Sequence, residues 1–157
     1  MPTSLRDTAD SVIRIAIEEA AKEGLQLYTF ALYFDHESPA LSVCMDTKEN
    51  SSVQVTAQNA HGVKYFRRFI DAEDLDQAVL WQANTGRNMS LGDFVKVNVA
   101  RMDLVQSELS NRDCLCLIQS VLAHETEIRS LAKYPDELVF CCTSPTDEVG
   151  VVWTSCA

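Results

Sequence analysis

Residues 25–34, LQLYTFALYF, decide the fold of this 157-residue chain. The stretch is rich in Leu, Tyr and Phe, and it is too short and too aromatic to favour a helix. A nearly continuous apolar run of this kind is typical of a strand that is covered on both faces. We therefore predict a strand here and place it in the centre of a sheet.

A helix is predicted immediately before this strand. Ser4 can cap its start, with Asp7 three residues later, and Gly24 stands where a left-handed C-terminal cap is needed. Charged residues occupy the other side of the helix, which makes it amphipathic. The apolar residues at helical spacing are Val12, Ile13, Ala16, Ile17, Ala20 and Ala21.

The chain after the central strand turns back. Residues 35–39, DHESP, form a polar turn that ends in a proline. Leu41, Val43 and Met45 then alternate with other residues, which predicts a second strand and a hairpin with the first. Residues 48–62 are polar and show no clear period. Val53 and Val55 alternate weakly, so a short edge strand is one option there.

Helical spacing returns in the second half of the chain. We predict helices over residues 71–86, 90–109 and 111–131, the last of which ends before Pro135. Residues 138–143 and 149–154 are rich in Val, Phe and Trp and flank a polar turn, which predicts a C-terminal hairpin.

The order of helix, strands, helices and strands is typical of the α+β class. The sequence shows no internal repeat, low-complexity tract or linker. We therefore predict a single α+β domain over residues 1–157, with the N-terminal helix first and a mainly antiparallel sheet of about four to five strands backed by helices.

The charge balance excludes several classes of ligand. Acidic residues number 23 and basic residues 13, so the formal net charge is −10. Such a charge argues against direct binding to nucleic acid, whose phosphates require a basic surface. It also argues against adhesion to an anionic membrane.

The N-terminus has no basic segment followed by an apolar one, and the longest apolar run is about half a membrane span. The sequence therefore predicts a cytoplasmic protein. Of its six cysteines, Cys114, Cys116, Cys141 and Cys142 lie in apolar stretches at spacings that point each pair apart. We interpret them as free structural thiols.

No catalytic motif is present. His124 and Glu125 resemble the start of a zinc-protease helix, but Ile128 stands where the second histidine ligand is needed. The five glycines are scattered, so no glycine-rich phosphate loop occurs. We predict no catalytic residue, no metal site and no cofactor.

One acidic run is the remaining signal for function. It places four carboxylates within six positions, and such a run can complement a helix dipole, form a solvated face or steer a basic protein partner. Aromatic residues flank it, either as partner anchors or as core residues. The acidic residues are Asp71, Glu73, Asp74 and Asp76, and the aromatic ones are Tyr65, Phe66, Phe69 and Trp81.

Residues 27–35, LYTFALYFD, also carry a resemblance. They resemble the opening strand of the bacterial domain-of-unknown-function 4303 family, whose members begin with a helix and then a Tyr-x-Phe-Ala-Leu-Tyr-like strand ending in Asp. Residues 43–49 look like the second strand of that family, with Asp46 in place of its usual Asn. Residues 112–131 and 138–147 fit the same layout, whereas residues 48–70 depart from it. The family has no established catalytic residues, but such domains are similar in size and architecture to cytosolic immunity proteins encoded beside bacterial toxins.

These observations favour a non-catalytic binding protein. The leading hypothesis is an immunity-type inhibitor that occludes the active site of a basic bacterial toxin domain through its acidic surface. The expected partner-binding residues are Asp71, Glu73, Asp74 and Asp76.

Other hypotheses remain open. One is a small enzyme that uses His36 with Asp35 or Cys44. Another is an acidic regulator that mimics DNA, which requires carboxylates spaced like phosphates over an extended face. Homodimerisation through an exposed edge strand near Val53 is a further option.

Overall fold

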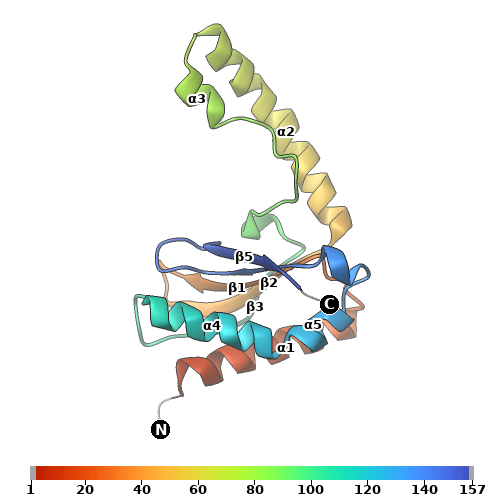
Figure 1. The fold of residues 1–157 in the computed structure, drawn as a ribbon, viewed down its shortest axis with the longest axis vertical. Helices are drawn as coiled ribbons and strands as arrows, with labels where there is room; N and C mark the ends of the chain where they lie inside the picture. Colours follow the sequence, from red (N-terminus) through yellow and green to blue (C-terminus); the bar gives the residue numbers. More distant parts are fainter. Residues whose placement is uncertain (1–2, 156–157) are drawn as a thin grey trace.

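The computed structural model describes residues 3–155, and its centre is a five-stranded sheet with the order β3-β2-β1-β4-β5 (Figure 1). Three of the four strand pairings are antiparallel, and the pairing of β1 with β4 is parallel. The predicted α+β class with a mainly antiparallel sheet is confirmed, and β1 lies in the middle as expected. The strands are β1 (Thr29–Asp35), β2 (Ala40–Asp46), β3 (Lys96–Asp103), β4 (Val139–Cys142) and β5 (Val151–Thr154).

The central strand begins later than predicted. Residues 25–28 are not part of β1. The amides of Leu25 and Leu27 bind to the ends of helices, since Leu25 N donates to Ala20 O at 2.9 Å and Leu27 N to Leu131 O at 3.0 Å. The hairpin between β1 and β2 is confirmed, with Asp35 opposite Ala40.

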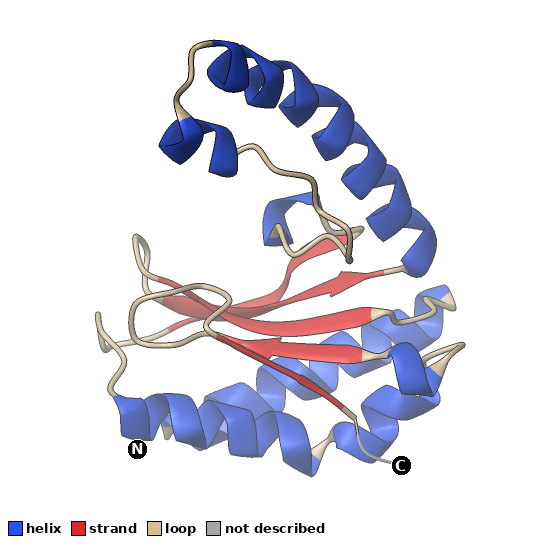
Figure 2. Cartoon of the chain, turned by 45° about the horizontal axis from the view of Figure 1, so that its top comes forward, coloured by secondary structure: helices blue, strands red, loops and turns tan. Residues whose placement is uncertain are grey.

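Three helices cover one face of the sheet: α1 (Leu5–Glu23), α4 (Asn111–Ala123) and α5 (Glu125–Ser130) (Figure 2). Both predicted caps of α1 are confirmed, since Ser4 Oγ accepts from Asp7 N at 3.1 Å and Gly24 adopts a left-handed φ of 65°. The predicted helix over residues 111–131 is confirmed in position, but it breaks at His124 into α4 and α5.

The main core lies between these helices and the sheet. Phe30 and Phe140 are fully buried on neighbouring strands, and their rings meet edge to face at 6.4 Å. Ile13 of α1 and Leu117 of α4 close the core from the helical side. Each such side chain contributes about 1.5–3 kcal/mol through burial.

A smaller cluster covers the other face of the sheet. Ala31, Cys44 and Cys141 point to this side, where Leu91 and Phe94 pack over them. The central strand is therefore buried on both faces, as its apolar sequence indicates. The short helix η1 (Leu91–Asp93) supplies part of this cover.

Residues 48–71 form α2 (Lys48–Asp71), the longest helix in the described part of the chain. The edge strand considered near Val53 is therefore wrong, and so is a dimer through that strand. Thr47 caps the helix, since its hydroxyl accepts from Asn50 N at 3.2 Å. Hydropathy conceals α2 because the inward-facing side of its first half is small or polar, at Ser51, Gln58 and Asn59 among others.

The helix predicted over residues 90–109 is also wrong. Residues 96–103 of this segment form the edge strand β3, in which Val99 pairs with Val43 of β2, and residues 104–109 are neither helix nor strand. The strand is irregular, because Asn98 and Ala100 adopt positive φ angles of 55° and 57° and the register shifts there. The free edge of β2 supplies the hydrogen bonds for β3, and periodicity along one segment cannot reveal such a partner.

Of the two remaining predicted elements, one forms only in part and the other is confirmed. Of the helix predicted over residues 71–86, only α3 (Leu75–Val79) forms, and Asp74 rather than Asp71 is its N-cap. The C-terminal hairpin is confirmed as β4 and β5, and η2 (Pro135–Glu137) precedes it. Among the helices of residues 3–155, none has the length and apolarity needed to cross a bilayer.

Candidate functional site: the α2–α3 arm

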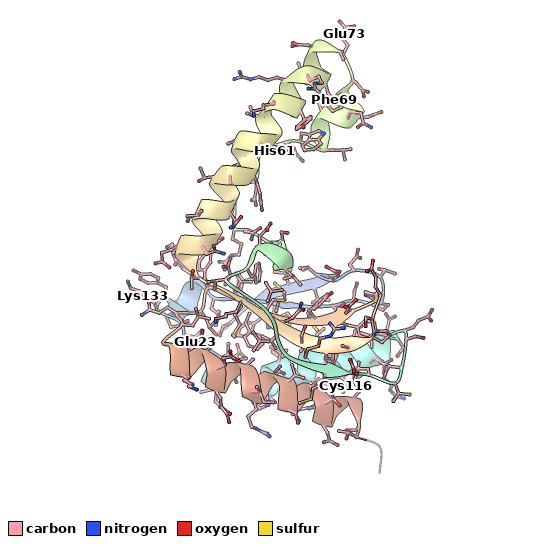
Figure 3. All side chains as sticks on the ribbon, turned by 180° about the vertical axis from the view of Figure 1, so that it is seen from behind. Glu23, His61, Phe69, Glu73, Cys116 and Lys133 are labelled. Carbon is pink, nitrogen blue, oxygen red and sulfur yellow. The ribbon has the colours of Figure 1, made fainter. Side chains whose placement is uncertain are left out.

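The α2–α3 hairpin projects from the body of the protein (Figures 1 and 2). Helix α2 leaves the sheet at the end of β2, α3 folds back beside its outer part, and the chain then returns along α2 to the sheet. We call residues 48–90 the arm. Figure 3 shows Glu73 at its outer end and His61 about midway along it.

A buried carboxylate holds the base of the arm. Asp46, at the end of β2, is fully buried, and its Oδ1 accepts from Asn50 Nδ2 at 2.8 Å and from Val95 N at 3.2 Å. Its Oδ2 is buried without a hydrogen-bond partner. Burial raises the pKa of Asp46, because the charged form is poorly solvated there. Asp46 thus joins the first turn of α2 to the segment that returns from the arm.

Asparagine side chains fasten the returning segment to α2. The side chain of Asn59 makes two hydrogen bonds of 2.9 Å to the backbone of Asn84: Nδ2 donates to Asn84 O, and Oδ1 accepts from Asn84 N. Buried Asn88 receives a hydrogen bond from Gln58 Nε2 at 2.9 Å and donates its backbone N–H to Ser51 Oγ at 2.9 Å. These contacts satisfy polar groups that would otherwise be costly to bury. The inner half of the arm is therefore held by polar contacts.

Arg87 ties the same segment to the sheet. Its guanidinium donates to Tyr28 O at 2.6 Å, to Thr29 Oγ1 at 3.1 Å and to Glu137 O at 2.6 Å. It also stacks on the Tyr28 ring, with Cζ 3.7 Å from the ring centroid. Burial lowers the pKa of Arg87 from its usual range. One side chain thus connects the arm to the starts of β1 and β4.

An aromatic cluster holds the outer half of the arm. Trp81 stacks on Tyr65 at 4.4 Å between ring centroids, and His61 packs against both rings. Beside this cluster, Val63, Phe66 and Trp81 line an open apolar pocket of about 300 Å³. Tyr65 and Trp81 are half-buried in this cluster and belong to neither core cluster of the protein, so their role as partner anchors stays a prediction.

The four predicted partner-binding carboxylates gather at the end of the arm. Asp71 ends α2, Glu73 lies in the turn with a φ of 57°, and Asp76 is in the first turn of α3. Asp74 also caps α3, because its Oδ1 accepts a hydrogen bond from Gln77 N at 3.1 Å. All four residues are exposed. The structure thus brings them together at one exposed tip.

Three basic residues precede this tip, and none of them is among the site residues predicted from the sequence. Lys64, Arg67 and Arg68 lie on the outer half of α2 and are exposed. Within residues 3–155, none of the three forms a salt bridge. The change of sign between residues 64–68 and 71–76 is visible in the sequence, and it could have been found by tracking charge along the helix.

The acidic residues elsewhere form separate groups. Glu18, Glu19 and Glu23 lie on α1, which covers the opposite side of the sheet from the arm (Figure 1). In Figure 3, Glu73 lies at the outer end of the arm, whereas Glu23 lies in the body of the protein. The tip of the arm is therefore an acidic surface of its own.

The structure separates two residues of the enzyme alternative, Cys44 and His36. Cys44 lies opposite Ala31, four residues along β1 from Asp35, so it is about 13 Å along the strands from the turn that carries His36. Cys44 is buried, and burial raises the pKa of its thiol. Asp35 accepts from Glu37 N and Ser38 N and pairs with Arg101 at 3.2 Å; these hydrogen bonds, that from Ser38 first, lower its pKa. His36 packs edge-on against Phe34.

Two further cysteines, on β4, also lack nucleophilic character. Cys141 and Cys142 are buried and unbonded, and burial raises the pKa of each thiol to about 12. A thiol must ionise to attack or to bind a metal, so both groups are inert at neutral pH. Among the described residues, no group of three or more His, Cys, Asp or Glu side chains is arranged to hold a metal ion.

Comparison with protein-family models, curated proteins and solved structures gives no significant match for this chain. The candidate site is therefore defined by its own geometry. That geometry combines a projecting two-helix arm, exposed apolar side chains along it and charged residues at its end.

Proposed function

We propose that the protein is a non-catalytic protein-binding domain that engages its partner through the arm. The observation that carries this proposal is the exposure of the arm: within α2, only Ser51 and Gly62 are buried. A projecting helix with this little burial contributes little to the core. Its exposed apolar side chains and its charged end are features of interaction surfaces.

The finer proposal is an immunity-type inhibitor that acts in the bacterial cytoplasm on a basic toxin domain. Two observations support it: the resemblance of residues 27–35 to the family named above, and the carboxylates at the end of the arm. An inhibitor of a basic active site would place such carboxylates over the cationic groups of the toxin. Complementary charge would then accelerate association and fix the orientation of the complex.

The first experiment is capture of partners from cells that express the protein naturally, with the tagged protein at low and at high salt. The proposal expects one stoichiometric basic partner whose binding is weakened by salt. Purified partner is then assayed for its own activity with and without the protein, which tests inhibition directly. Capture of no stoichiometric partner at either salt would refute the proposed function.

The variant that tests the acidic tip is Asp71→Lys/Glu73→Lys/Asp76→Lys. Asp74 is left intact because it caps α3. The matched control, Glu18→Lys/Glu108→Lys/Glu148→Lys, changes the net charge equally at exposed positions outside the arm. We expect the tip variant to associate at least about tenfold more slowly than the control. An unchanged rate and affinity would show that the acidic tip is not the binding surface.

A further inference from the structure

Exposed apolar side chains are concentrated on the outer half of the arm. Of the 14 large hydrophobic residues that are exposed in residues 3–155, five lie between positions 63 and 80. Their exposed fractions run from 42% to 72%, and one of them, Val63, lines the apolar pocket beside Trp81. A concentration of this kind indicates an interaction surface. The five residues are Val63, Ile70, Leu75, Val79 and Leu80.

The charges around this surface are of both signs and occur in order. The bases at 64, 67 and 68 come first along α2, and the acids at 71, 73, 74 and 76 follow at the tip. None of these seven residues forms a salt bridge within the described part of the chain. A uniformly basic partner would attract the acids but repel the bases. A surface with the same pattern in reverse would satisfy both groups.

A second copy of this chain presents that reversed pattern when it is turned by a two-fold axis. A two-fold interface requires a surface that is complementary to itself, and a block of bases beside a block of acids meets that requirement. We propose that two copies pair through the outer halves of their arms, with the two α2 helices antiparallel. The inference does not rest on the proposed function, since it requires no other protein.

The dimensions of α2 set how far the arms overlap. Lys64 and Asp71 are about 10 Å apart along the helix axis, at about 1.5 Å per residue. An antiparallel overlap of about two turns therefore places the acidic tip of each copy beside the bases of the other. Val63 and Ile70 lie within the same overlap and would be buried there. Such an interface is smaller than the roughly 800 Å² per partner of a standard complex, so the dimer should dissociate in the micromolar range and weaken with salt.

The test uses two variants of opposite charge. Lys64→Glu/Arg67→Glu/Arg68→Glu makes the outer arm entirely acidic, and Asp71→Lys/Glu73→Lys/Asp76→Lys makes it predominantly basic. Each variant alone sets like charges against each other across the interface, and the dimer dissociation constant should rise by at least about a hundredfold. Mixed in equal amounts, the two variants should form a heterodimer, because both contacts are then attractive.

Sedimentation equilibrium over a range of protein and salt concentrations measures the mass of each species, which is compared with the 17.5 kDa of the monomer. Far-ultraviolet circular dichroism shows that each variant is folded. The control Glu18→Lys/Glu108→Lys/Glu148→Lys should dimerise at least as strongly as the natural sequence. A natural sequence that stays monomeric into the high-micromolar range, or a variant mixture that stays monomeric, would overturn the proposal.

A second pair of variants tests the apolar part of the interface. Ile70→Asp places a charge within the proposed overlap of the α2 helices, and Leu122→Asp places one at an equally exposed position on α4, with exposed fractions of 44% and 45%. We expect only Ile70→Asp to abolish the dimer. Equal dimerisation of both variants would contradict pairing through the arm.

The dimer and the basic partner are separable in the same set of variants. The all-acidic arm should lose the dimer and still capture a basic partner, because its tip carboxylates are unchanged. The basic arm should lose both. A natural sequence that captures a basic partner but stays monomeric refutes the dimer alone. A natural sequence that dimerises but captures no basic partner refutes the proposed function alone.

Discussion

Replacement of Arg87 by methionine tests whether one side chain holds the arm to the sheet. Methionine keeps an unbranched side chain but removes three hydrogen bonds and the stacking of a cation on Tyr28. Hydrogen bonds from a charged donor contribute about 1.5–3 kcal/mol each, and stacking contributes about 0.5–2 kcal/mol. Two terms reduce this sum. Tyr28 O still accepts from Val139 N at 3.1 Å, and removing a half-buried guanidinium recovers part of its desolvation cost.

We expect Arg87→Met to lower the free energy of unfolding by about 3 kcal/mol in urea denaturation. Amide hydrogen exchange should localise the loss, because residues 84–95 would detach from the sheet before α1 or α4 opens. Arg14→Met is the matched control, since Arg14 is exposed on α1. That control should stay within about 0.5 kcal/mol of the natural sequence. A similarly small change for Arg87→Met, with unchanged exchange at residues 84–95, would refute the anchoring role.

Three further predictions follow from buried or crowded positions. Because burial raises the folded-state pKa of Asp46, the natural protein should lose stability as pH rises from the unfolded-state pKa of about 4 through the folded-state pKa. Asp46→Asn should lack this loss, so its free energy of unfolding in urea should rise relative to that of the natural protein from pH 4 to pH 7. Parallel pH profiles of the two proteins would contradict this role of Asp46. Gly62→Ala should slow amide exchange in α2 by an amount equivalent to about 0.5–1 kcal/mol, because the added Cβ would lie 3.6 Å from Trp81 O, an ordinary contact; faster exchange would show that the site is too tight. Iodoacetamide should modify half-buried Cys116 well before Cys142 in the folded protein, as peptide mass mapping would show, because Cys142 is buried and its pKa is raised to about 12. Early modification of Cys142 would indicate that the sheet opens readily.

Local signals in the sequence were sufficient to predict the elements that are defined by contacts between neighbouring residues of the chain. The caps at Ser4 and Gly24 define α1 because a cap is a contact between near neighbours in the chain. The apolar run of β1 indicates a central strand because both of its faces require cover. The alternation and turns that predict the two hairpins are local in the same sense.

Contacts between distant residues decided the rest. β3 is a strand because β2 offers it a free edge, and α2 is a long helix because Asn84 and Asn88 return to its polar side from 25 and 30 positions away. The inward side chains of such a helix carry no apolar period, so its helical nature is hidden from hydropathy.

The candidate site divides in the same way. The sequence by itself determined that Asp71, Glu73, Asp74 and Asp76 are close along the chain and that the protein is acidic. Only the tertiary structure decided that these residues end a projecting arm and that Asp74 is occupied as a cap. The reason is that a surface is formed by the direction in which helices leave the core. That direction is fixed here by the buried contacts of Asp46 and Arg87 at the base of the arm.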